Sequence, residues 1–222
     1  MGEVVSSGAA VRAVPLGVPS SAELGLLDPA ERRRGARFVS AAAADEFLAG
    51  RIALRVFAAE LAGVRPDALE ADYQCGGCRA GNPDHGRPGY RLRDGSAGPL
   101  LSLSRAAGWA VLAGARPGGG LLRLGVDAER LGRTDFPGFD AVALTPGERH
   151  LVSGSADAGR LRTRFWARKE AFLKATGSGL RRDPAMVDAS HGMLEGVLLA
   201  DLDAAVLGLP GGVVVTLATS PA

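Results

Sequence analysis

Apolar residues recur at helical spacing in two long segments of the chain. The first segment, residues 41–61, has one apolar side and ends at Gly63, because glycine and the nearby Pro66 both interrupt helices. The second segment, residues 159–176, carries an apolar stripe and ends at Gly177. The pattern therefore predicts two long helices, one in each half of the chain.

Two shorter helices are expected where a capping side chain precedes a proline, which suits a first helical turn. One begins after Asp28 and the other after Thr145, with Glu148 at the spacing of a capping box. Residues 74–99 are rich in glycine, proline and aspartate, so we expect loops and turns there.

Alternating or β-branched apolar residues predict the strands. The segments with this pattern are 101–104, 109–112, 121–129, 186–187, 197–199 and 213–217. A Pro-Gly-Gly-Gly turn at residues 117–120 divides the chain into two halves, 1–117 and 118–222. Helices and strands in both halves predict an α+β fold.

Charge and composition exclude several classes of protein. The chain has 46% hydrophobic and 23% charged residues, which is ordinary for a folded protein. A formal net charge of +2 with scattered arginines disfavours nucleic-acid binding. The first thirteen residues lack a secretory signal, and acidic residues interrupt the apolar stretches, so we expect a cytoplasmic protein without membrane spans.

A short cysteine motif is a weak candidate for a metal site. Cys75 and Cys78, with His85, supply too few ligands for a structural zinc site, and two cysteines make no disulfide framework.

Two carboxylates alternate on the predicted strand 121–129. Because alternate residues of a strand share a face, Asp127 and Glu129 project together. Carboxylates this close repel one another unless a cation lies between them, and such hard oxygen ligands suit Mg²⁺. A solvated edge of polar residues is an equally good interpretation of this motif alone.

The chain has only two lysines, Lys169 and Lys174, and both lie in the predicted helix 159–176. Glu170 and Lys174 are four residues apart and share one helix face, as in a routine surface ion pair. Large apolar neighbours instead indicate a mostly buried helix. A third carboxylate there would complete a Mg²⁺ site, and a lysine beside it would neutralise phosphate oxygens.

Several motifs occur in one order along residues 25–218, and together they resemble the surfactin-type 4′-phosphopantetheinyl transferases. The motifs are Gly86-Arg87-Pro88, Leu101-Ser102-Leu103-Ser104-Arg105, Gly125-Val126-Asp127-Ala128-Glu129, Glu148, and a final block that contains Trp166, Lys169, Glu170, Lys174, Gly177 and Gly179. The resemblance implies a pseudo-two-fold pair of similar α/β subdomains with coenzyme A between them. It also implies transfer of phosphopantetheine to a serine of an acyl, peptidyl or aryl carrier protein, with release of 3′,5′-ADP, by a monomeric enzyme.

The resemblance also assigns roles to residues. Asp127, Glu129 and Glu170 would hold Mg²⁺ against the pyrophosphate of coenzyme A. Lys174 would contact the transferred phosphate, and Glu170, or Glu148 through a water, would be the base. Residues implied on the coenzyme A side are Arg34, Arg37, Arg87, Ser104, Arg105 and Lys169, together with Lys174.

The chain departs from the family pattern at some positions. Arg105 stands where the family has histidine, and Asp45 and Glu46 stand where it often has arginine. Two alternatives therefore remain: a non-catalytic relative that binds coenzyme A or a carrier protein, and another Mg²⁺-dependent phosphoryl enzyme. Phe136 and Phe139 are candidates either for a carrier contact or for core packing.

Overall fold

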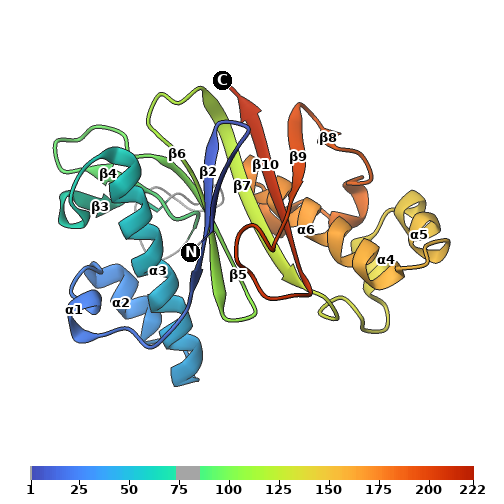
Figure 1. Cartoon of the computed structure of the whole chain (residues 1–222), viewed down its shortest axis with the longest axis horizontal. Coiled ribbons are helices and arrows are strands. Elements are labelled where there is room, and N and C mark those ends of the chain that lie inside the picture. The colour runs from blue at the N-terminus through green and yellow to red at the C-terminus, as the bar shows by residue number, and fades with distance from the viewer. Residues whose placement is uncertain (1, 74–85) are drawn as a thin grey trace.

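Strands occupy the middle of the molecule, and helices cover both sides (Figure 1). The computed structural model describes residues 2–73 and 86–222, so Cys75, Cys78 and His85 lie outside the described residues. The described strands are β1 (Glu3–Ser6), β2 (Ala9–Pro15), β3 (Leu69–Ala71), β4 (Tyr90–Leu92), β5 (Leu100–Ala106), β6 (Trp109–Ala115), β7 (Leu121–Arg130), β8 (Met193–Leu194), β9 (Val197–Leu202) and β10 (Val213–Pro221). The described α-helices are α1 (Ser21–Leu24), α2 (Pro29–Gly35), α3 (Ala41–Ala62), α4 (Phe139–Ala143), α5 (Pro146–Ser153) and α6 (Ala158–Thr176).

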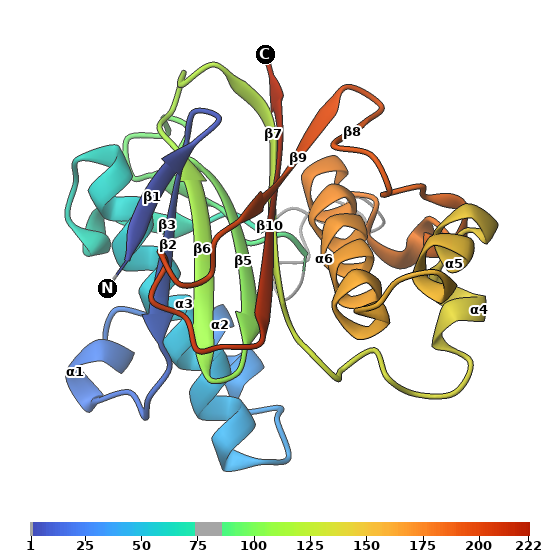
Figure 2. The same ribbon diagram turned by 45° about the vertical axis from the view of Figure 1, so that its right-hand side comes forward.

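Two four-stranded antiparallel sheets form the centre. The first has the order β1-β2-β6-β5 and the second β7-β10-β9-β8, while β3 and β4 form a separate pair. Helix α3 lies against the first sheet and α6 against the second, as Figures 1 and 2 show. The α+β fold predicted from the sequence is confirmed.

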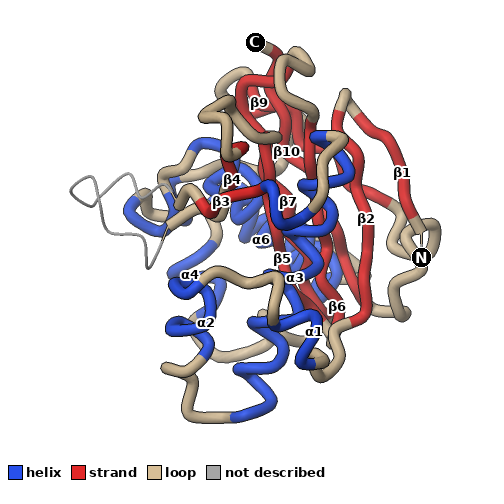
Figure 3. Tube along the Cα trace, turned by 90° about the vertical axis from the view of Figure 1, so that its left-hand side faces the viewer, coloured by secondary structure: helices blue, strands red, loops and turns tan. Residues whose placement is uncertain are grey.

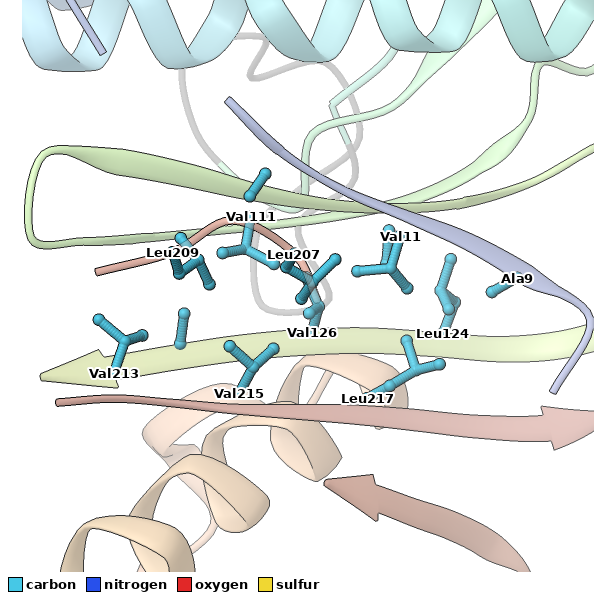
Figure 4. Close-up of a cluster of buried hydrophobic side chains, with 13 residues drawn as sticks. Ala9, Val11, Val111, Leu124, Val126, Leu207, Leu209, Val213, Val215 and Leu217 are labelled. Carbon is cyan, nitrogen blue, oxygen red and sulfur yellow. The ribbon is translucent and has the colours of Figure 1, made fainter. Parts of the chain in front are cut away.

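The two sheets share one apolar core (Figure 4). It contains Val11 and Val111 from the first sheet, and Val126 and Val215 from the second, all without solvent exposure. Because Val126 faces this core, the alternation of the strand turns its neighbour Asp127 to the other side, toward α6. One core contains residues from both predicted halves, 1–117 and 118–222. The division of the chain into these halves therefore stays a prediction.

The helices form where the pattern and the caps predict them. Ser40 caps α3, and Gly63 ends it with a φ of 68°, a left-handed conformation that favours glycine. Helix α6 ends in the same way at Gly177, with a φ of 69°. Helices α2 and α5 begin with complete capping boxes at Asp28 and Thr145. None of the described helices is both long and apolar enough to cross a membrane.

Several segments differ from the prediction. Strands β1 and β2 were not expected, and they lie side by side near the N-terminus (Figure 3). Residues 186–187 are not a strand, because a short 3-10 helix, Pro184–Met186, occupies this segment. Residues 74–99 include strand β4 as well as turns, since it pairs with β3.

Candidate active site

Helix α6 lies directly on strand β7 at Gly125. A Cβ atom at this position would overlap the carbonyl oxygen of Ala171 and would lie 2.6 Å from the amide nitrogen of Ala175. Only glycine permits this approach of the two backbones. Lys174 lies one turn after Ala171 on α6, and Asp127 lies two residues after Gly125 on β7. The close contact of the two elements therefore brings Lys174 beside Asp127.

Asp127 is the centre of the site. Its Oδ1 atom accepts hydrogen bonds from Lys174 Nζ at 2.6 Å and from Ser104 Oγ at 2.8 Å. Its Oδ2 atom is buried and has no hydrogen-bond partner in the described part of the chain. A buried acceptor left unpaired costs about 1–3 kcal/mol, so this oxygen favours an additional ligand.

The negative charge of Asp127 raises the pKa of two further carboxylates. Burial and then Asp127 raise the pKa of Glu129 to about 7, although Trp166 Nε1 donates to its Oε1 at 3.1 Å. Burial and Asp127 also raise the pKa of Glu170, whereas Lys174 lowers it. The structure therefore brings Glu129 and Glu170 close enough to Asp127 for repulsion between them.

The donor set suits a divalent cation. The unpaired buried oxygen of Asp127 and the carboxylates of Glu129 and Glu170 are hard oxygen ligands of the kind that Mg²⁺ prefers. Within residues 2–73 and 86–222, however, no group of three His, Cys, Asp or Glu side chains is arranged so that it could hold a metal ion. Lys174 instead occupies one oxygen of Asp127. Coordination of Mg²⁺ by Asp127, Glu129 and Glu170 therefore stays a prediction.

Glu148 lies inside the protein, and its role as a base through a water stays a prediction. It has no solvent exposure, and its Oε2 atom accepts from the amide of Thr145 at 2.8 Å and pairs with Lys169 at 2.5 Å. Its Oε1 atom accepts from the amide of Ala189 at 2.8 Å. Both oxygens therefore hold the start of α5 and the segment before β8.

Lys169 lies inside the protein as well, and its contact with coenzyme A stays a prediction. This fully buried ammonium also donates to the carbonyl oxygens of Ala143 at 2.7 Å and Pro184 at 2.9 Å. With Glu148, these acceptors use all three of its protons. Burial lowers the pKa of Lys169, and the pairing with Glu148 opposes this effect. The lysine therefore ties α4, α5 and α6 together.

Three arginines surround the ring of Phe47 on α3. The guanidinium carbons lie 5.4 Å from the ring centroid for Arg34, 5.1 Å for Arg51 and 5.7 Å for Arg105. Burial lowers the pKa of Arg105, and the charges of Arg51 and Arg34 lower it further. We name this set the arginine cluster; its concentrated positive charge suits an anion.

Sequence reasoning missed Arg51. The predicted helix 41–61 also carries Asp45, Glu46, Arg55 and Glu60, so nothing in the sequence set Arg51 apart. Its side chain is only 6% exposed, and Nε and Nη1 have no hydrogen-bond partner among the described residues.

The other predicted contacts to the nucleotide have different places. Ser104 donates to Asp127, and its contact with the nucleotide stays a prediction. Arg87 donates to the carbonyl oxygens of Leu101 on β5 and Leu124 on β7, where it joins the two sheets. Arg37 is exposed just after α2.

A cavity of about 390 Å³ connects the two parts of the site. The charged side chains that line it are Glu46, Arg105, Glu129, Arg130 and Arg133. It thus extends from Arg105 of the arginine cluster to Glu129. A concave site with charged groups at both of these positions suits a phosphate-rich substrate.

Part of this chain is similar to a known class of enzymes. A sequence profile of the 4′-phosphopantetheinyl transferase superfamily matches residues 123–195, which include Asp127, Glu129, Glu170 and Lys174. The matched segment therefore contains the strand and the helix that carry the site.

A curated relative agrees with this similarity. Over 175 residues the chain is 29% identical to the 4′-phosphopantetheinyl transferase HetI of Nostoc sp., and the match covers 76% of this chain and 68% of that protein.

Proposed function

We propose that the protein is a surfactin-type enzyme that transfers 4′-phosphopantetheine from coenzyme A to a serine of an acyl, peptidyl or aryl carrier protein. The observation that carries this proposal is the arrangement around Asp127. One of its oxygens accepts hydrogen bonds from Lys174 and Ser104, and the other is buried and has no partner among the described residues. A cavity extends from Glu129 to Arg105 of the arginine cluster.

The reaction requires neutralisation of phosphate charge. The serine oxygen attacks the β-phosphorus of the pyrophosphate, and the bond to 3′,5′-ADP breaks, so negative charge builds on the phosphate oxygens. Asp127, Glu129 and Glu170 would hold Mg²⁺, which supplies Lewis-acid stabilisation when bound. The ammonium of Lys174, which donates a hydrogen bond to Asp127, would contact the transferred phosphate.

Glu170 is the candidate base. Its half-buried carboxylate has a raised pKa, which favours acceptance of a proton from the serine hydroxyl. Glu148 is the weaker candidate, because its two oxygens are occupied inside the protein.

The two substrates then contact different parts of the protein. The arginine cluster binds the anionic nucleotide end of coenzyme A. Phe136, which is 54% exposed, offers an apolar contact for the carrier protein. Phe139 is buried and contacts Trp166 edge to face at 5.5 Å, so it belongs to the core.

The test follows the mass of the carrier. An apo-carrier protein is incubated with coenzyme A, Mg²⁺ and the enzyme, and its intact mass is measured. We expect a phosphopantetheine adduct that a chelator abolishes. Glu170→Gln should abolish the adduct, whereas Glu195→Gln, the same change at a surface ion pair with Arg182, should leave it intact.

Other outcomes favour the alternative functions. Binding of coenzyme A without an adduct would favour a non-catalytic relative, and breakdown of coenzyme A without a carrier would favour another phosphoryl enzyme. Full activity of Glu170→Gln would exclude the role of that residue.

A further inference from the structure

The guanidinium of Arg51 is buried without a carboxylate partner among the described residues. Arg55, one turn later on α3, shows the usual arrangement, because it pairs with Asp28 at 3.0 Å and Glu31 at 3.1 Å. A buried charge without a partner costs several kcal/mol. Arg51 instead lies against two aromatic rings, Phe47 at 5.1 Å and Tyr73 at 5.3 Å.

Tyr73 is itself anchored by a buried carboxylate. Its hydroxyl donates to Glu31 Oε1 at 2.8 Å, and Tyr90 donates to the same oxygen at 3.1 Å. Arg55 and the amide of Asp28 bind the other oxygen of Glu31 at 3.1 Å and 3.2 Å. Four donors therefore fix Glu31, and Glu31 fixes the ring that supports Arg51.

We infer that Tyr73 and Glu31 are positioning residues that hold Arg51 as a fixed positive charge behind Arg34 and Arg105 in the arginine cluster. This inference rests on the proposed function, in which the cluster binds the phosphate-bearing nucleotide end of coenzyme A. A guanidinium held before the ligand arrives loses little freedom on binding, so the anion is bound more tightly.

The geometry supplies a matched pair of variants. Tyr73→Leu removes the ring beside Arg51 together with its hydrogen bond to Glu31. Tyr90→Phe removes a hydrogen bond to the same oxygen of Glu31, but the ring of Tyr90 lies over Arg55 at 4.8 Å and not over Arg51. Both variants disturb the network around Glu31, and only the first removes the support of Arg51.

The experiment measures binding by calorimetry, with thermal unfolding as a control for folding. Coenzyme A and dephospho-coenzyme A, which lacks the 3′-phosphate, are titrated into the wild type and both variants. For Tyr73→Leu we expect the Kd of coenzyme A to rise about threefold to thirtyfold, which is the range of a lost cation–π contact. The Kd of dephospho-coenzyme A should rise less, and Tyr90→Phe should bind coenzyme A like the wild type.

Glu31→Gln tests the anchor itself, with an expected rise in the Kd of coenzyme A of about twofold to tenfold from a weakened hydrogen bond. Equal affinity of Tyr73→Leu and the wild type would overturn the inference. So would equal losses for the two ligands, or equal losses in Tyr73→Leu and Tyr90→Phe. If the wild type binds no coenzyme A, the proposed function fails as well.

Discussion

The buried ion pair of Lys169 and Glu148 allows a test of whether Lys169 stabilises the fold or contacts the substrate. Lys169→Met replaces the ammonium by an apolar group of similar length and leaves Glu148 buried without its cation. Removal of one partner of a buried ion pair costs about 3–5 kcal/mol, because the remaining charge is uncompensated. The carbonyl oxygens of Ala143 and Pro184 also lose their donor.

This loss should be visible in thermal unfolding. For a chain of this size, each kcal/mol shifts Tm by about 2–4 °C, so the decrease should be roughly 6–20 °C. At a temperature where the variant is folded, its Kd for coenzyme A should equal that of the wild type, because Lys169 lies inside the protein. Lys169→Met with Glu148→Gln should recover part of the stability, since no charge then stays buried.

The opposite pattern would refute this reasoning. If Lys169→Met kept its Tm but bound coenzyme A much more weakly, the lysine would be a substrate contact and not a structural one. A matched control is Arg182→Met, which breaks an exposed pair with Glu195 and should change the unfolding free energy by about 1 kcal/mol or less.

Three other perturbations test the surrounding structure. Gly125→Ala should destabilise the protein by about 1–3 kcal/mol in denaturant titrations, because its methyl group forces α6 away from β7; a neutral effect would contradict this close contact. Asp127→Asn should abolish transfer, and calorimetry should show weaker Mg²⁺ binding without a large change in Tm. Burial raises the pKa of Asp201, but hydrogen bonds from Arg168 and Arg164 outweigh this and lower it below 3.8. Its stabilisation is therefore present above pH 3.8 and lost as the pH falls through the folded pKa; Asp201→Asn should remove this acid dependence of unfolding, and an unchanged profile would exclude it.

The sequence was most informative where local signals coincide. Caps, prolines and glycines located helices α2, α3, α5 and α6, because these residues act within one turn of the chain. The alternation of β7 also placed Asp127 opposite the core correctly. Strands β1 and β2 were missed, since a short alternation of alanine and valine is a weak signal until a second sheet covers it.

The roles predicted for Glu148 and Lys169 were assigned without knowledge of their burial. Glu148 and Lys169 have the residue types of a catalytic pair, and only the packing shows that they bind one another and the backbone around them. Burial depends on contacts between distant segments, which no local pattern reveals. Arg51 was missed for a related reason. The sequence does not show that its guanidinium contacts the ring of Tyr73, which belongs to a separate segment of the chain.

The junction between β5 and β7 restricts how substrates can enter. Ser104 on β5 donates to Asp127 on β7, Ser102 accepts from the amide of Val126 at 2.9 Å, and Arg87 bridges both strands. A hinge that opened the protein along this line would break these bonds and separate the shared core. For the proposed enzyme, we therefore expect coenzyme A to enter the cavity without an opening along this line, so turnover should not depend on domain opening.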